Sequence, residues 1–415
     1  MRKYPWVIGL AALAGISAAQ AAVAIPPAPP GAAAFMEARN WLWAEGQLLL
    51  LAIPLLFLVT GLGARLRSAC AKLAGGNRFW TLTLFALAYL VLSAILRAPF
   101  DYYRDYLSLQ GTASFDETPA SWALQEAVSL GAKLVVAGLF VWIPYALIRR
   151  SPRRWWLYAA VASVPVAFLV LAALPVWVAP LTTHYLPLQD KALAADIENL
   201  AARCGVHGIP VLVGGDDDTV VGLGPTRRIV LDSDIFKNET PDQIRFTVGH
   251  ELKHYVENDN YKALAIIAAL LLIGFWLTNR IGRGLIARFG RWFGFTELSD
   301  PASLPLIVLI LTAFWLCALP LFNLYARSIE HEADRFGLEL THENDGMALN
   351  EAGYITRDHD SPDWDTFFLI FRATHPSDAE RIRFANSYHP WAEGKPLVYG
   401  DVCKPETTPP PASGR

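Results

Sequence analysis

The chain has 415 residues, of which 53% are hydrophobic and 18% are charged, with a mean hydropathy of +0.30. A soluble globular protein carries about 25% charged residues, so this composition indicates a membrane protein. The net charge of −3 leaves no basic excess and gives no indication of a nucleic-acid partner. The four cysteines are widely spread without a C-x-x-C pair, which excludes a zinc knuckle and a dense disulfide framework.

The N-terminus has the pattern of an export signal. Arg2 and Lys3 precede an apolar run from Val7 to Ala18, and Ala19-Gln20-Ala21 matches a small-residue cleavage site before a Pro-rich linker. An uncleaved first membrane helix fits the same residues. Residues 1–24 are therefore expected to be either a signal peptide or a first transmembrane helix.

Six further apolar stretches approach the ~20 residues that a bilayer-spanning helix needs. Four of them predict an N-terminal membrane domain over residues 25–178, and two more fall inside the domain that follows. The stretches are 46–64, 80–98, 127–148, 156–177, 261–278 and 303–325.

Arginine and lysine gather in alternate loops. Clusters follow the first, third and fifth of the six stretches, whereas the segment 99–125 is mainly acidic. The positive-inside rule then places the basic loops in the cytoplasm and residues 178–260 and 326–415 on the exported side. The alanine-rich, lysine-poor composition is typical of a bacterial source, so we expect an integral protein of a bacterial inner membrane. The basic residues are Arg65, Arg67, Lys72, Arg78, Arg149, Arg150, Arg153, Arg154, Arg280, Arg283, Arg288 and Arg291.

Between Pro180 and Asp259 the pattern changes to that of a globular α+β unit. A predicted helix ends at Gly205, and strands are predicted at Ile209–Val213 and Arg228–Leu231, joined by a glycine-containing hairpin. The acidic residues 216–218 in this loop are interpreted as a solvated turn. Cys204 and Cys403 are both predicted on the exported side, and the sequence leaves open whether they pair.

The stretch His250-Glu251-Leu252-Lys253-His254 has the pattern H-E-x-x-H. Two histidines four residues apart lie on one face of a helix, and imidazole nitrogens are good zinc ligands. The glutamate beside the first histidine can take a proton from a zinc-activated water. The stretch predicts one zinc ion per chain, held by His250 and His254, with Glu251 as general base. A chance match on a surface helix is the alternative.

A catalytic zinc needs a third protein ligand. The next candidate helix, YARSIEHEADRFGLEL, follows the last apolar stretch. Glu330 and Asp334 are four residues apart and share a face, so one carboxylate can bind zinc while the other accepts the outer N–H of a ligand histidine. Spacing alone does not choose Glu330 over Glu332 or His331, and a solvated amphipathic helix fits the same pattern.

Three blocks in this order, GHELKHYVEND, SIEHEADRFG and THPSDAERI, resemble those of the integral-membrane zinc metalloproteases of the CAAX prenyl protease type and their HtpX-like bacterial relatives. Two upstream segments, RAPFDYYRDY and WVAPLTTHYLPLQDKAL, extend the resemblance over roughly residues 80–390. It implies an α-helical polytopic membrane protein with a zincin-like (gluzincin) α+β metalloprotease domain. That domain would cover residues 179–400, be interrupted by the helices near 261–278 and 303–325, and precede a disordered tail at 401–415.

The resemblance also assigns roles at matching positions. The two histidines and the glutamate of the H-E-x-x-H stretch match the family's metal ligands and general base. Glu330 matches its glutamate ligand, and Asp334 the aspartate of its E-x-x-x-D motif. Arg327 matches an arginine that precedes the glutamate, and His375 matches a histidine near the active site that is suited to hydrogen-bond the oxyanion.

Two departures from the family pattern concern the substrate. Asp217-Asp218-Thr219 stands where the family has an Asn-Ala-aromatic stretch before its substrate-binding edge strand, so the subsite chemistry must differ. In addition, the arginine-rich loops place the catalytic side away from the cytoplasm, where prenylated tails are found.

The predicted function is therefore that of a membrane-embedded zinc metalloendopeptidase acting on membrane-associated or unfolded peptides and proteins. Its expected partners are a peptide or protein substrate and the lipid bilayer; the sequence specifies no oligomeric state. One alternative is a cytosol-facing CAAX prenyl endoprotease acting on lipidated C-terminal tails. The other is a non-catalytic membrane scaffold or holdase, against which the intact Glu251 argues.

Overall fold

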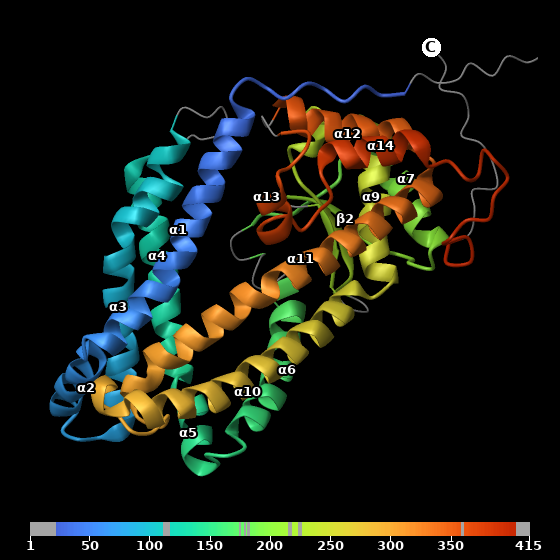
Figure 1. Cartoon of the computed structure of the whole chain (residues 1–415). Coiled ribbons are helices and arrows are strands. Elements are labelled where there is room, and N and C mark those ends of the chain that lie inside the picture. Colours follow the sequence, from blue (N-terminus) through green and yellow to red (C-terminus); the bar gives the residue numbers. More distant parts are fainter. Residues whose placement is uncertain are drawn as a thin grey trace, which may run out of the picture.

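The computed structural model describes residues 22–403 apart from 111–116, 174–175, 178–179, 181–182, 215–217, 223–225 and 358–360. Residues 1–21 of the predicted signal segment and 404–415 of the predicted tail lie outside the described residues. Long helices cross one another in the lower part of Figure 1, and shorter helices gather with the strands above them.

The described residues form mainly helices. The helices are α1 (Ala32–Val59), α2 (Leu62–Leu73), α3 (Arg78–Asp105), α4 (Pro119–Phe140), α5 (Trp142–Arg150), α6 (Trp155–Ala173), α7 (Lys191–Arg203), α8 (Ile235–Asn238), α9 (Pro241–Val256), α10 (Asp259–Phe293), α11 (Leu304–Thr341), α12 (Asn344–Arg357), α13 (Thr366–Phe371) and α14 (Asp378–Ser387). The strands are β1 (Leu186–Pro187), β2 (Val211–Val213), β3 (Thr219–Val221) and β4 (Arg228–Leu231).

Five helical segments of the described chain are long and apolar enough to cross a membrane. Their surfaces carry exposed apolar side chains, among them Leu48, Val135 and Leu321, as expected of helices that face lipid. The predicted stretch 156–177 corresponds to α6, whose apolar part, Trp155–Val170, is shorter than the other five. The segments are Ala32–Val59, Arg78–Leu109, Pro119–Arg150, Asp259–Phe293 and Pro301–Thr341.

The first membrane helix begins 14 residues earlier than the predicted stretch 46–64. The first turns contain polar residues, so the hydropathy pattern did not predict this start. Tertiary contacts satisfy these polar side chains in the structure. Arg39 donates to the carbonyl oxygen of Arg104 at 2.7 Å, and Asn40 donates to Asp365 at 2.7 Å. The helix ends before Gly61, which has the positive φ of 67° that favours glycine.

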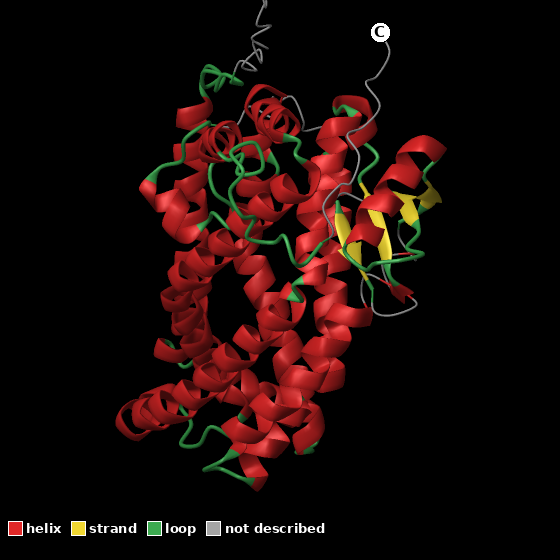
Figure 2. Ribbon diagram, turned by 90° about the vertical axis from the view of Figure 1, so that its right-hand side faces the viewer, coloured by secondary structure: helices red, strands yellow, loops and turns green. Residues whose placement is uncertain are grey.

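The strands form one sheet in the order β1-β2-β4-β3 beside the helical bundle (Figure 2). The predicted hairpin between Ile209–Val213 and Arg228–Leu231 is wrong, because β2 and β4 run parallel. The hairpin joins β3 to β4 instead, since the β-branched residues of β3 pair with the outer edge of β4. Gly222, at φ +92°, makes the reversal, and a Cβ there would lie 2.3 Å from the carbonyl oxygen of Thr226.

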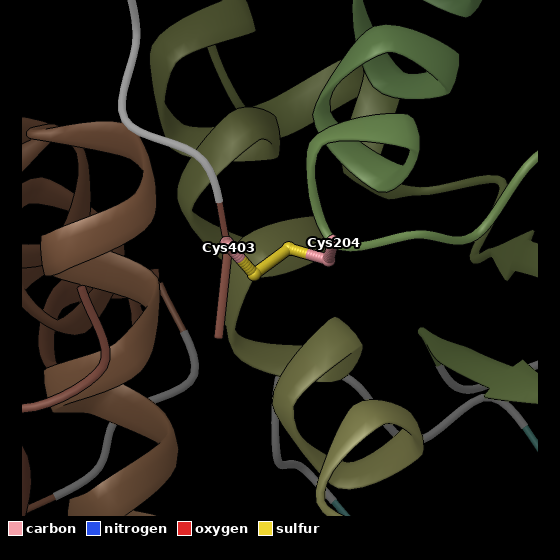
Figure 3. Close-up of a disulfide and its surroundings, with 2 residues drawn as sticks. All are labelled: Cys204 and Cys403. Atoms are coloured by element: carbon pink, nitrogen blue, oxygen red, sulfur yellow. A yellow bond between two sulfur atoms is a disulfide. The ribbon is translucent and has the colours of Figure 1, made fainter. Parts of the chain in front are cut away.

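A core beneath the sheet joins α7, α9 and the end of α11. Leu193, Ile197 and Leu200 of α7 are buried in it, on the helix face that the sequence predicted. Cys204, which follows α7, forms a disulfide with Cys403, 199 residues later (Figure 3). Residues 401–403 therefore differ from the disordered tail predicted to begin at 401, because the disulfide and this core hold them.

The helices α9 and α11 pack closely because glycines face each other where they meet. A Cβ on Gly249 would lie 2.9 Å from Cγ2 of Thr341, and one on Gly337 would lie 3.1 Å from the backbone nitrogen of His250. Although α10 and the first half of α11 lie between them in sequence, the C-terminal half of α11 lies directly against the histidine helix.

Candidate active site

Local sequence fixes where the histidine helix α9 begins. Thr240 and Gln243 form a reciprocal capping box, with Pro241 at the first helical position. Ten residues into the helix, His250 projects from a buried face, and His254 follows one turn later. Their Nε2 atoms lie 3.4 Å apart.

Glu330 of α11 completes a three-residue cluster. Its Oε2 lies 3.1 Å from Nε2 of His250 and 3.6 Å from Nε2 of His254. A tetrahedral ion with ligand bonds of about 2.0–2.2 Å separates its ligand atoms by roughly 3.3–3.6 Å. The three side chains are therefore arranged as a metal requires, and they form the group of potential ligands found among the described residues.

The charge of this cluster also fits a cation. Burial lowers the pKa of His250, but hydrogen bonds to Asp334 and Glu330 outweigh it and raise the pKa to about 10. Burial likewise lowers the pKa of His254, whereas Asp259 and Glu330 raise it, with a net rise. The carboxylates thus favour positive charge between the imidazoles, and a bound metal ion would take the place of the protons.

The rival third ligands point elsewhere. Glu332 accepts hydrogen bonds from Arg335 and from the Tyr399 hydroxyl, the latter at 2.8 Å. The His331 ring packs on Phe384 with a centroid distance of 4.5 Å. Geometry therefore favours Glu330, a choice that helical spacing alone could not make.

Each histidine of the cluster has its own carboxylate behind it. Asp334, fully buried, lies 3.0 Å from Nδ1 of His250. Asp259, the first residue of α10, lies 3.0 Å from Nδ1 of His254. A carboxylate at Nδ1 keeps the proton on that nitrogen and leaves Nε2 free to bind metal.

Two cationic side chains, the partly buried Arg381 and the buried Lys253, hold these carboxylates in place. Arg381 of α14 donates to both oxygens of Asp334, at 2.9 and 2.5 Å, and lies 2.7 Å from Glu351. Lys253 donates to Asp259 at 2.6 Å. Burial raises the pKa of Glu351 to about 8, although Arg381 opposes the rise.

Sequence reasoning missed three of these supporting residues. Arg381 stands six residues after His375 inside the block THPSDAERI, and Asp259 ends the block GHELKHYVEND, where Lys253 also lies. The position of Asp259 within one turn of the histidine helix was the available signal. Nothing in the sequence indicated that Arg381 reaches Asp334.

Glu251 faces the same cluster from α9. Its Oε1 lies 4.0 Å from Nε2 of His250. Burial raises the pKa of this carboxyl, and the two neighbouring imidazoles oppose the rise. A carboxylate beside the ligand set and partly shielded from bulk water can act as a base toward a molecule bound next to it.

His375 lies on the open side of the cluster, in the loop between α13 and α14. Its Nε2 is 3.2 Å from Oε2 of Glu330, and its side chain is half exposed. Arg327 lies away from the cluster: its guanidinium donates to the backbone carbonyls of Leu369 and Ala373, the latter at 2.8 Å. Arg327 thus anchors the segment that carries His375.

The edge strand β3 lies beside the histidine helix, and its outer edge is free of another strand among the described residues. Of the predicted departure Asp217-Asp218-Thr219, Asp217 lies outside the described residues, as does Asp216 of the predicted solvated turn. Asp218 accepts a hydrogen bond from the backbone nitrogen of Asp232 at 2.8 Å. Thr219 begins the strand.

Comparison with known families gives adjoining matches. The model of peptidase family M48 matches residues 187–389. The model of the CAAX prenyl protease N-terminal domain, described as having five membrane helices, matches residues 33–184. Together the two models span most of the chain.

Individual proteins agree with these matches. The chain is 27% identical over 358 residues to a protein of Bacillus subtilis named uncharacterized metalloprotease YhfN, covering 85% of this chain and 84% of the relative. It is 24% identical to CAAX prenyl protease 1 of Saccharomyces cerevisiae, covering 70% and 69%. The crystal structure of S. mikatae Ste24p matches the fold with a TM-score of 0.69 at 20% identity, covering 84% of this chain and 86% of that one.

The family models, the relatives and the membrane-length helices agree with one another. The chain is an integral-membrane metalloprotease and belongs to peptidase family M48.

Proposed function

We propose that this protein is a zinc metalloendopeptidase whose metal is held by His250, His254 and Glu330. One observation carries the proposal: three ligand atoms lie within 4.8 Å of one another although two come from α9 and the third from Glu330 of α11, 80 residues after His250. Two imidazoles and a carboxylate suit zinc, and this set leaves a coordination position for chemistry. A scaffold has no need of the partly buried Glu251 beside it.

In this mechanism the chain's own residues move protons and fix geometry. Bound zinc supplies Lewis acidity toward water and the scissile carbonyl. Glu251 takes a proton from the attacking water and delivers it to the leaving amine. His375, on the open side of the cluster, donates a hydrogen bond to the oxyanion. Asp334 and Asp259 hold the ligand histidines in one tautomer.

The substrate is proposed to be an extended peptide lying along β3. The free edge of this strand offers backbone groups for pairing, and β3 packs beside α9. The protease part, residues 179–400, is interpreted as a zincin-like domain into which α10 and the first half of α11 are inserted. Because those helices are membrane-length, membrane-associated or unfolded chains suit the site better than folded soluble proteins.

The catalytic side is proposed to face the exported side of a bacterial inner membrane. Two independent features support this orientation. The arginine-rich loops lie at the end of the membrane helices opposite the metal cluster. The protease part also contains the Cys204–Cys403 disulfide. Disulfides persist in oxidising compartments such as the periplasm and are rare in the cytosol.

A second candidate is a CAAX prenyl endoprotease, which the name of the yeast relative favours. The change to Asp217-Asp218-Thr219 and the disulfide argue against it. Hydrolysis rates of a prenylated CAAX peptide and of the same peptide without the prenyl group distinguish the two candidate functions. Our proposal predicts no advantage for the prenylated peptide, whereas strong dependence on the prenyl group would favour the alternative.

Removal of the metal tests the proposal. The purified full-length protein in lipid is incubated with a quenched peptide library before and after treatment with a zinc chelator. We expect hydrolysis to fall to background, since the attacking water loses its activation, and to return when zinc is added back. Hydrolysis that persists after zinc content reaches zero would refute the metal assignment.

A further inference from the structure

A large polar cavity lies at the end of the molecule opposite the histidine helix. It has a volume of about 980 Å³ and lies where the start of α3, the end of α5 and the second half of α10 meet. Figure 1 shows α5 at the lower end of the molecule, whereas α9, α12 and α14 lie together near the top. The cavity therefore belongs neither to the metal cluster nor to the edge strand.

The lining of this cavity is strongly cationic. Five arginines and a single glutamate contribute to it. The five arginines are exposed to solvent, and within the described part of the chain none of them is ion-paired with a carboxylate. They come from three helices, so the fold brings together charges that are distant in sequence. The charged residues are Arg78, Arg149, Arg283, Arg288, Arg291 and Glu297. We call this site the arginine cavity.

Uncompensated charges of one sign repel each other, so their convergence calls for an anion. The position of Arg78 strengthens this point. It is the first residue of α3, where the helix dipole disfavours a cation and favours a bound anion. Asp300, an acidic residue that lines an adjoining cavity, is already paired with Arg67. A phosphate group, which guanidinium binds in bidentate geometry, suits the arginine cavity.

An adjoining cavity identifies the source of the phosphate. It has a volume of about 420 Å³, shares Arg78, Arg149 and Glu297 with the first, and is also lined by Phe79, Leu82 and Trp142. Phe79 and Trp142 are both 43% exposed, next to membrane-length helices. Aromatic side chains at this level lie at the headgroup region of a bilayer. A free phosphate would use only the arginines, whereas a lipid uses both cavities.

We propose that the arginine cavity binds the headgroup phosphate of an anionic phospholipid, with the first part of its acyl chain against Phe79, Leu82 and Trp142. Such a lipid neutralises the arginines and bridges α3, α5 and α10. The inference does not depend on the peptidase mechanism.

Lipid binding to the purified full-length protein in neutral detergent tests the proposal. Native mass spectrometry compares phosphatidylglycerol with phosphatidylcholine, and inorganic phosphate is titrated as a competitor. For the wild type we expect at least tenfold tighter binding of phosphatidylglycerol, with little competition from millimolar phosphate. Equal binding of the two lipids, or displacement of phosphatidylglycerol by phosphate, would overturn the proposal.

Two double variants of equal charge locate the site. Arg149→Gln/Arg283→Gln removes two exposed arginines of the cavity, and Arg150→Gln/Arg153→Gln removes two exposed neighbours outside its lining. We expect the first pair to lose most of the preference for phosphatidylglycerol and the second to keep it. Equal effects of the two pairs would indicate general surface charge and contradict the proposal. Zinc content of each variant verifies its folding, and Arg288→Gln replaces the first pair if it misfolds.

Discussion

At the residue scale, the geometry of the metal-ligand cluster depends on the carboxylates that hydrogen-bond to the histidines as much as on the ligands themselves. His250 and His254 look alike in sequence, yet one is held by Asp334 of α11 and the other by Asp259 of α10. The sequence predicted the ligands and the base from spacing and resemblance. For Asp259 the sequence held only one signal, its position just after the histidine helix. It could not give Arg381, because the contact with Asp334 depends on where α14 lies in space.

Removing the charge of Asp259 tests its orienting role. In Asp259→Asn we expect zinc affinity to fall about 10–100-fold, because His254 loses the carboxylate that fixes its tautomer. Competition with a chelator of known affinity measures the change. Asp234→Asn, at an exposed aspartate paired with Lys237, serves as the matched control and should bind zinc like the wild type. Unchanged affinity in Asp259→Asn would show that Asp259 only stabilises Lys253.

At the element scale, the site depends on how closely α9 and α11 approach. The helices themselves follow from hydrophobic pattern and caps, which is why α7 and α9 could be predicted. The strand order could not be predicted, because β3 has only three residues and its place in the sheet depends on pairing with β4. Likewise, the early start of α1 depends on polar contacts with residues far away in sequence.

The close approach of α9 and α11 can be tested at Gly337. A Cβ there would lie 3.1 Å from the backbone nitrogen of His250, a main-chain atom that cannot move alone. We expect Gly337→Ala to cost about 1–3 kcal/mol of stability by overpacking and to lower zinc occupancy. Gly284→Ala is the control, because Gly284 of α10 has nothing within 4 Å of such a Cβ. Thermal unfolding and metal content are measured for both variants. A Gly337→Ala variant with the stability and zinc occupancy of the wild type would contradict the packing argument.

At the scale of the whole molecule, the chain separates two ends of unlike chemistry. One end holds the metal ligands, the sheet and the disulfide; the other holds the arginine cavity. The hydropathy pattern and the arginine-rich loops are enough to predict that the metal ligands and the arginine-rich loops lie at opposite ends of the membrane helices. The pairing of Cys204 with Cys403 could not be predicted, because only the packing of residues 397–403 on α11 brings the two cysteines together.

Thiol labelling of intact cells tests the orientation. In a Cys70→Ala/Cys317→Ala background we expect a membrane-impermeant reagent to label Cys204 and Cys403 only after reduction, because an oxidising compartment keeps them paired. With Cys204→Ser/Cys403→Ser added, a cysteine introduced by Arg153→Cys serves as the cytoplasmic control and should stay unlabelled until cells are opened. Labelling of the Arg153→Cys position in intact cells would reverse the topology.

The central claim is that Glu251 carries the proton in peptide hydrolysis at a zinc site, and Glu251→Gln tests it most directly. Hydrolysis and zinc content are measured on the same purified sample, with Glu198→Gln at an exposed glutamate of α7 as the control. We predict that Glu251→Gln binds one zinc per chain but loses at least about a thousandfold in kcat, since the general base is gone. Zinc retained with wild-type turnover would contradict the account.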